Sequence, residues 1–252
     1  MMREQIHTNY RRLMDDKIKE LQKQNERKKL LLHACCAPCS TSCLEILRKY
    51  FDITVLFYNP NITEENEYHK RLEEEIRLIG IFNANLLKRT ITSSSDDEDL
   101  LNKNIESKEA PSLIGIMEAK YDPLNFLSGV KGYENEKEGG ERCKICFDLR
   151  LREAAELARR NGFDFFTTTL TISPMKNAHL LNGIGIEAGE EAGVAFLPSD
   201  FKKKNGYLRS VELSGEFDLY RQDYCGCVFS KAERSCYKCR KQNEESACEM
   251  AG

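Results

Sequence analysis

The chain has 252 residues and is 40% apolar, which is enough for one large domain with a packed core. No apolar run reaches the roughly 18 residues of a membrane helix, and the charged N-terminus lacks the apolar centre of a secretory signal, so we expect a cytoplasmic protein without a membrane partner. The net charge of −3 gives no overall case for a nucleic-acid partner. Residues 200–241 nevertheless hold ten Lys and Arg against six acids, which indicates a local basic face or ordinary solvated surface.

Helical and strand patterns alternate along the chain. A polar, amphipathic helical extension is predicted at residues 1–29, followed by one main domain at residues 30–230. Strands are predicted at residues 29–34, 53–58, 85–87, 164–169 and 194–197, and helices at residues 40–50, 63–79, 124–132, 142–161 and 176–192. This alternation predicts an α/β fold, a doubly wound parallel sheet with helices on both faces.

Two polar segments depart from this pattern. Residues 92–109 are acidic and are predicted to form a mobile insertion, and residues 231–252 form a cysteine-containing polar tail. In doubly wound sheets, sites form at the carboxyl ends of the strands. Cys35, Asn59 and Thr169 each fall at the end of a predicted strand, so we expect the site there.

Eleven cysteines fall into four groups. In a reducing cytoplasm, clustered cysteines indicate metal binding or redox chemistry more than structural disulfides. The first group, HACCAPC at residues 33–39, joins a predicted strand to a predicted helix, whose N-terminus would stabilise thiolates or an anionic thiolate-bound cluster. Buried structural thiols are the alternative for Cys35 and Cys36, and Cys43 is expected to be a structural thiol within the helix.

The second group consists of Cys143 and Cys146, which lie three apart at the start of a predicted helix and therefore share one face. Alone, this C-x-x-C could be half of a zinc site or a redox pair. With Cys35 and Cys36 it supplies four thiolates, the ligand count of both a [4Fe–4S] cluster and a Cys₄ zinc site. The count predicts a metal centre without choosing the metal.

The third group is CGC at residues 225–227. A disulfide across one intervening residue closes a very small ring, and strained disulfides are easily reduced. We therefore expect a redox-active pair, with ligation of a metal at the same site as the alternative. The fourth group lies in the polar tail and is expected to have a peripheral role: Cys236, Cys239 and Cys248.

Several stretches carry a resemblance to a known family. They are LLHACCAPCS at 31–40, FDITVLFYNPNI at 51–62, YDPLNFLSGVKGYENEKEGGERCKICFDLRL at 121–151, TTTLTISPMKN at 167–177 and DFKKKNGYLRSVELSGEFDLYRQDYCGCVFS at 200–230. The joint presence of CC-x-P-C, ERC-x-x-CF and LYRQ-x-YCGC is highly specific. On these residues, the chain resembles the non-cobalamin epoxyqueuosine reductases of the QueH type, while the N-terminal helix, the 92–109 insertion and the tail after Ser230 look like additions.

The resemblance implies a Rossmann-like core of the adenine nucleotide alpha hydrolase type with helical additions. It implies reduction of epoxyqueuosine to queuosine at the wobble position of a tRNA with a GUN-type anticodon, with an unidentified electron donor. It also implies a [4Fe–4S] cluster and allows an additional iron ion. Residue by residue, the cluster ligands match Cys35, Cys36, Cys143 and Cys146, and the redox pair matches Cys225 and Cys227. Some members carry Asp where this chain has Cys39, which makes Cys39 a candidate ligand of the second iron.

The implied reaction needs further groups. Loss of the epoxide oxygen requires a proton donor, for which Asp223, Tyr224 and His33 are candidates. A loop base must be splayed out of the RNA and presented to the site, and Tyr207 or Tyr224 could stack it. Candidates for phosphate contacts, each with plain surface charge as the alternative, are Arg150, Arg152, Lys202 to Lys204, Arg209 and Arg221.

Two alternative functions are compatible with parts of the sequence. An ATP-dependent tRNA thiolase can share this fold class and a cluster, but it needs an SGGxDS-type loop where this chain has HACCAPCS. A zinc-binding structural module that binds RNA would use the cysteine groups as closed sites. The position of the first cysteines at a strand end, where active sites form, disfavours the second alternative.

Overall fold

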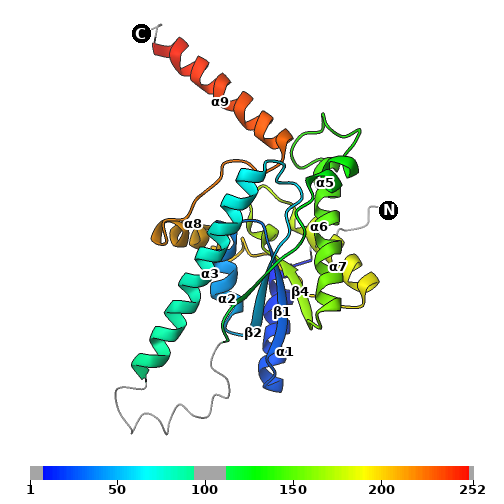
Figure 1. Cartoon of the computed structure of the whole chain (residues 1–252), viewed down its shortest axis with the longest axis vertical. Helices are drawn as coiled ribbons and strands as arrows, with labels where there is room; N and C mark the ends of the chain where they lie inside the picture. The colour runs from blue at the N-terminus through cyan, green and yellow to red at the C-terminus, as the bar shows by residue number, and fades with distance from the viewer. Residues whose placement is uncertain (1–7, 94–111, 250–252) are drawn as a thin grey trace.

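The computed structural model describes residues 8–93 and 112–249, which are built around a five-stranded sheet (Figure 1). The strands are β1 (Lys28–Ala34), β2 (Phe51–Phe57), β3 (Gly115–Glu118), β4 (Phe165–Thr168) and β5 (Ala195–Phe196). They are all parallel and lie in the order β3-β2-β1-β4-β5. The predicted α/β fold with a parallel sheet is confirmed. Apart from its first two residues, which end a helix, the predicted insertion at 92–109 lies outside the described residues.

The central strand β1 is buried on both faces. It pairs with β2 from Lys28↔Phe51 to Ala34↔Phe57, and with β4 on its other side. Its consecutive leucines, Leu30 to Leu32, are fully buried. A strand inside a parallel sheet packs on both faces, so a continuous apolar run replaces the usual alternation.

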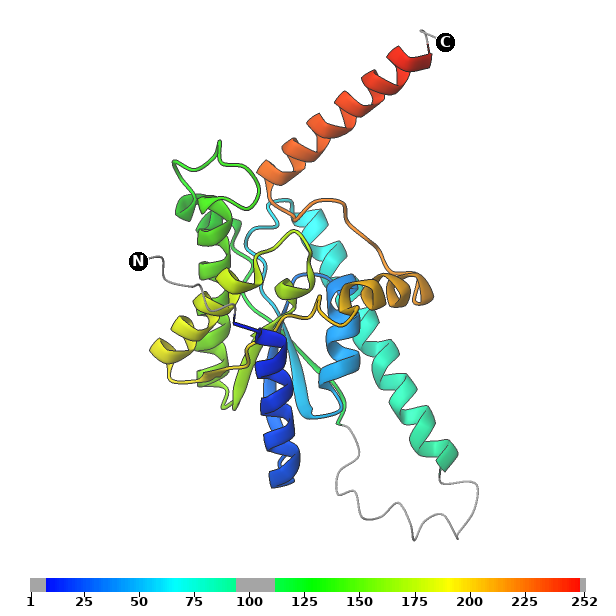
Figure 2. The same ribbon diagram turned by 180° about the vertical axis from the view of Figure 1, so that it is seen from behind.

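Helices cover the two faces of the sheet (Figures 1 and 2). The helices are α1 (Tyr10–Gln24), α2 (Ala37–Leu47), α3 (Glu65–Ser93), α5 (Pro123–Gly129), α6 (Glu141–Arg160), η1 (Thr169–Ile172), α7 (Ala178–Ala192), α8 (Gly206–Glu216) and α9 (Val228–Glu249). One hydrophobic core joins α1, α2 and α3 to Leu30 and Leu32 of β1, and a second core joins α6 and α7 to Leu31. No helix among the described residues is long and apolar enough to cross a membrane.

Helix α1 shares the first core. Its Met14, Ile18 and Leu21 are buried with residues of the sheet and of α2. The segment set apart in the sequence as an extension therefore packs on the domain, although Leu13 of its predicted apolar stripe is exposed.

The strand predicted at residues 85–87 is wrong. These residues continue α3, whose Leu78, Ile79 and Phe82 keep a helical face buried against the sheet. The third strand is instead β3, a short edge strand in which only alternate residues are partly buried. Its four residues carry too little pattern for recognition, because an edge strand needs no continuous apolar run.

Candidate functional site

The carboxyl ends of β1, β2 and β4 open into one cavity of about 670 Å³. The expected site residues lie at these ends, with Cys35 after β1, Asn59 after β2 and Thr169 at the start of η1. The first three cysteine groups converge on this cavity. The cysteines lining it are Cys35, Cys36, Cys39, Cys143, Cys146, Cys225 and Cys227.

The first group is shaped by the transition from β1 to α2. Cys36 is the N-cap of α2, in extended conformation, and Pro38 lies in the first turn, so the chain turns and adjacent thiols converge. The sulfurs of Cys35 and Cys36 are 3.6 Å apart. Those of Cys35, Cys36 and Cys39 all lie within 4.8 Å of one another, which gives a group that could hold a metal ion. Neither Cys143 nor Cys146 falls within that compact group. Cys43 points instead into the first hydrophobic core, as expected.

The three thiols of this group share their protons unequally. Hydrogen bonds from the Cys36 and Cys39 thiols, aided by the positive charges of Lys176 and Arg150, hold the pKa of Cys35 well below its usual value. Donation to Cys35 raises the pKa of Cys36 to about 12, and the same contact raises the pKa of Cys39. The sharing of protons therefore favours Cys35 as the thiolate of this group, and a metal ion would displace the protons of the other two thiols.

The second group begins helix α6. The Gly139 amide donates to Cys143 Sγ at 3.2 Å. Cys143 packs beside Cys35 in one apolar cluster, whereas Cys146 packs with Cys227 in another. Burial raises the pKa of Cys143, and raises that of Cys146 to about 11. This C-x-x-C thus bridges the first and third cysteine groups.

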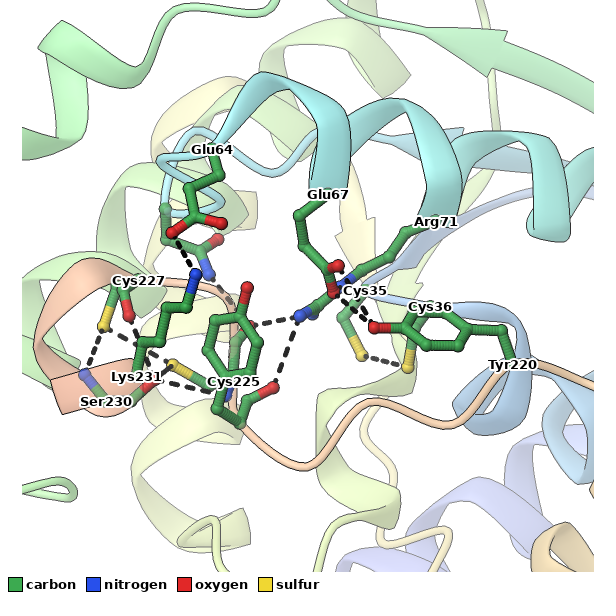
Figure 3. A network of polar contacts seen from close by, with 12 residues as sticks. Cys35, Cys36, Glu64, Glu67, Arg71, Tyr220, Cys225, Cys227, Ser230 and Lys231 are labelled. Atoms are coloured by element: carbon green, nitrogen blue, oxygen red, sulfur yellow. Dashed lines mark hydrogen bonds and ion pairs between the residues drawn. The ribbon is translucent and has the colours of Figure 1, made fainter. Parts of the chain in front are cut away.

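The third group is a pair of thiols at the base of α9 (Figure 3). The sulfurs of Cys225 and Cys227 are 3.6 Å apart, and both cysteines are unpaired thiols. The Ser230 amide donates to Cys227 Sγ at 3.3 Å, and Ser230 Oγ lies 3.0 Å from Cys225 Sγ. The Cys227 thiol, together with the charge of Lys176, holds the pKa of Cys225 well below its usual value, whereas donation to Cys225 raises the pKa of Cys227.

Gly226 between these cysteines has a φ of +120°. A Cβ there would lie 2.8 Å from Ile62 Cγ1 and 3.3 Å from Arg71 Nη1. Both the backbone conformation and the close approach therefore require glycine at this position.

Two comparisons of sequence agree on one family. The model of the family "Epoxyqueuosine reductase QueH" matches residues 30–233. A protein named epoxyqueuosine reductase QueH from Streptococcus pyogenes serotype M1 is 41% identical over 222 residues, covering 88% of this chain and 78% of the relative. Relatives of the same name from Staphylococcus epidermidis and Thermotoga maritima are 39% and 33% identical, covering 88% and 81% of this chain and 84% and 91% of the relatives. The chain belongs to the epoxyqueuosine reductase QueH family. This confirms the resemblance and makes the chain an oxidoreductase.

The QueH match ends at residue 233, within the second turn of α9. Cys236 and Cys239 lie beyond it and are exposed on that helix. The side chain of Cys248 is outside the described part of the chain. Neither Cys236 nor Cys239 lines the cavity.

Arg71 of α3 is a site residue that the sequence did not reveal. Its side chain is buried, and Figure 3 shows it reaching from α3 to the segment that carries the third cysteine group. It donates to the carbonyls of Cys225 at 3.1 Å and Tyr224 at 3.4 Å, and its Nε donates to Glu67 at 2.7 Å. Tyr220 also donates to Glu67, so α3 fixes this segment through side chains. The i, i+4 Glu67–Arg71 pair resembles ordinary surface pairing, and nothing in its spacing shows that it is buried.

Lys176 is a second residue whose place became visible only in the fold. It lines the cavity from the loop between η1 and α7. Burial opposes its charge, but the negative charges of Cys35 and Cys225 act against burial and raise its pKa. One ammonium group therefore acts on both the first and third cysteine groups.

His33 lies beneath the cavity and does not line it. It is fully buried, with Nδ1 2.8 Å from Thr168 Oγ1 and Arg150 donating to its Nε2 at 3.3 Å. Burial, with the nearby Arg150 charge, lowers its pKa to about 3. The neutral imidazole supports the floor of the site, which argues against the proton-donor role considered for it.

Most of the basic residues considered for phosphate contacts are already engaged. Arg150 is buried against Asn59, and Arg152 pairs with acids on α6 and α7. The remaining pairings are Lys202–Asp200, Lys204–Asp15 and Arg209–Glu45. Arg221 differs, because it lines the cavity and donates to Ser214 Oγ at 3.1 Å.

Proposed function

We propose that this protein reduces epoxyqueuosine to queuosine at the wobble position of tRNAs with GUN-type anticodons. The observation that carries the proposal is the single cavity at the carboxyl edge of the sheet, where three cysteine groups meet in a chain of the QueH family. A volume of about 670 Å³ suits one base extruded from the anticodon loop. A tRNA substrate also implies that the reaction takes place in the cytoplasm.

In this proposal Cys35, Cys36, Cys143 and Cys146 hold a [4Fe–4S] cluster. The donor set fits such a group, since all four thiols line one cavity and Cys35 already favours the thiolate. Arg71, Arg150 and Lys176 line the same cavity and would offset the negative charge of a thiolate-bound cluster. Cys39 offers a further thiol to an additional iron beside Cys35 and Cys36. When bound, the cluster supplies electrons or a Lewis-acidic iron for the epoxide oxygen.

Cys225 and Cys227 serve as the two-electron reductant. As they close to a disulfide, the two thiols release two electrons and two protons. The epoxide loses both C–O bonds, becomes the alkene of the cyclopentene ring, and its oxygen leaves with the two protons as water. The disulfide is then reduced by an electron donor that remains to be identified. The lowered pKa of Cys225 makes it the thiol that is ionised first.

The cavity also bears on the choice of proton donor. Asp223 lines the cavity but pairs with Lys238 and Arg234, and the Lys238 hydrogen bond holds its pKa below the usual value. Asp223 is therefore a poor acid near neutral pH. Burial raises the pKa of Tyr224, which keeps its hydroxyl protonated at the cavity wall. We favour Tyr224 over Asp223 for proton delivery.

The proposal is tested by anaerobic purification, with iron, sulfide and zinc analysis, followed by an assay on epoxyqueuosine-containing tRNA. About four irons and four sulfides per chain and ATP-independent formation of queuosine are expected. A zinc-loaded, colourless protein that binds RNA without turnover would favour the structural module instead, provided that cluster loss in air had been excluded. Turnover that requires ATP would favour thiolase-like chemistry.

A further inference from the structure

Helix α9 projects from the body of the protein, as both views show (Figures 1 and 2). Its 22 residues span about 33 Å at the usual helical rise. Every side chain described from Lys231 to Lys241 is exposed. A lone helix gains little stability without packing, so an ordered arm of this kind is a candidate surface for a partner.

The base of α9 is part of the cavity wall. Cys227 immediately precedes the helix, and Ser230, Arg234 and Tyr237 all line the cavity. A molecule that delivers one of its groups into the cavity will therefore lie next to the first three turns of α9. Because the base of α9 is continuous with the cavity wall, we infer that the partner of this helix is the substrate and not an unrelated protein.

The exposed stretch is strongly basic. Residues 231–241 contain five Lys and Arg and one acid, Glu233, in a chain whose net charge is −3. Glu233 pairs with Arg142, and Lys231 pairs with Glu64. Arg234 and Lys238 share the single carboxylate of Asp223. The excess of cations is confined to this stretch, because Arg240 and Lys241 end it and α9 continues with Glu244, Glu245 and Glu249.

The same stretch lacks the apolar stripe of a helix that docks on protein. Its one large exposed apolar side chain is Tyr237, which lies at the cavity. The Arg234 guanidinium carbon lies 5.4 Å from the centre of the Tyr237 ring. An aromatic ring backed by Arg is a surface on which an RNA base can stack, and surrounding cations suit phosphates.

We propose that residues 231–241 of α9 form a docking arm for the RNA substrate. Lys238, Arg240 and Lys241 lie along phosphates of the anticodon stem, and Tyr237 stacks on a loop base beside the one that enters the cavity. The identity of the RNA rests on the proposed function. Nearly all of the arm lies beyond the segment that matches the QueH family, so it contributes affinity and not the reaction itself.

The test compares two triple variants with equal loss of charge. The first is Lys238→Gln/Arg240→Gln/Lys241→Gln in the arm. The second is Arg12→Gln/Lys19→Gln/Lys23→Gln on α1, a helix that lies away from α9 in both views (Figures 1 and 2) and exposes all three side chains. The probe is an RNA hairpin with an unmodified GUN-type anticodon loop, titrated against the full chain over a range of salt concentrations.

The arm variant is expected to bind the hairpin about tenfold more weakly or worse at 0.1 M salt, with a log–log salt slope reduced by about 2 to 3. The α1 variant is expected to match the unaltered protein. Tyr237→Ala is expected to weaken binding without changing the salt slope, because stacking releases no counterions. In turnover assays, KM should rise for both arm variants.

Hairpin affinity and salt slope that are equal for the two triple variants would overturn the docking arm, even if the protein reduces epoxyqueuosine. Self-association through α9, seen as a dimer that the arm variant loses without any change in RNA binding, would also overturn it. Conversely, arm-dependent RNA binding by a protein that leaves epoxyqueuosine unchanged would support the arm and reject the proposed reaction.

Discussion

The first and third cysteine groups lie in the same cavity but are held in different ways. Cys35 and Cys36 are placed by regular structure, at the end of the central strand and the N-cap of α2. Cys225 and Cys227 lie on an irregular segment that is fixed by side chains, chiefly Arg71 and Ser230. A site framed by the backbone of a buried sheet suits a metal centre of fixed geometry. A segment held by a few hydrogen bonds suits the proposed redox role of this pair of thiols, which would close to a disulfide and open again.

The largest expected effect, and the clearest difference between the two cysteine groups, follows from removing one thiol of the first group. Cys35→Ser is expected to abolish iron binding and to reduce turnover by roughly a thousandfold or more, since a missing thiolate leaves the proposed cluster without a ligand. Iron and sulfide analysis of the anaerobic protein measures the loss. Cys43→Ala is the matched control, because Cys43 is buried next to this group but faces the core. It should keep full iron and lose about 1 kcal/mol of stability. Full iron in Cys35→Ser would contradict its role as a ligand.

Removing a thiol from the third group should give the complementary result. Cys225→Ser is expected to retain iron and sulfide but to lose turnover by about a hundredfold, since a single thiol cannot close to a disulfide. Absorbance of the cluster and queuosine formation are measured on the same sample. Cys239→Ser, at an exposed position on α9, is the control and should behave like the unaltered protein. If Cys225→Ser keeps full turnover with a chemical reductant, the pair is not the source of electrons.

The hydrogen bonds from Arg71 provide a smaller perturbation. Arg71→Gln removes the charged donor that holds the carbonyls of Cys225 and Tyr224, so kcat is expected to fall about tenfold and the midpoint potential of the Cys225/Cys227 pair to shift. Arg71→Lys should restore part of the lost kcat and reverse part of the shift in midpoint potential.

Arg77 offers a matched control on the same helix. It donates to the carbonyls of Phe217 and Asp218, so it fixes the same chain segment further from the cavity. Arg77→Gln should leave the potential of the thiol pair unchanged. Equal effects of the Arg71 and Arg77 variants on that potential would mean that Arg71 acts only through general stability.

The smallest expected effect concerns Glu75, which is fully buried on α3. Complete burial raises its pKa to about 8 from an ordinary value of 4.5. Between these values the folded protein holds a proton that the unfolded chain has lost, so stability falls as pH rises from about 4.5 to about 8. Thermal unfolding of the iron-free protein measures this trend. Glu75→Gln should flatten it and gain stability near pH 8. An unchanged pH trend in the variant would assign the effect to other groups.

The comparison of the two cysteine groups also explains what the sequence could reveal. Strands β1, β2 and β4 were predictable, because buried parallel strands are continuous apolar or β-branched runs. The clustering of cysteines at a strand end and at a helix start was likewise local information. Strand β3 was not predictable, because a short edge strand carries little pattern.

The contacts that complete the site are long-range and leave no local signal. Arg71 meets the Cys225 carbonyl, and Lys176 acts on both thiol groups, only because the sheet brings distant segments together. Gly185 of α7 is another example. Glycine weakens a helix locally, yet a Cβ at Gly185 would lie 2.5 Å from the Phe196 ring of β5, so close packing across the fold requires glycine there.

A single turnover in the absence of any external electron donor tests the central claim most directly. The iron-loaded protein, with Cys225 and Cys227 reduced and excess reductant removed under anaerobic conditions, is mixed with an excess of epoxyqueuosine-containing tRNA. Queuosine and free thiols are then counted in the same sample. We expect about one queuosine per chain and the loss of two thiols, mapped to a Cys225–Cys227 disulfide. Iron-loaded, reduced protein that forms no queuosine, or forms it with both thiols intact, would show that the two thiols are not the reductant.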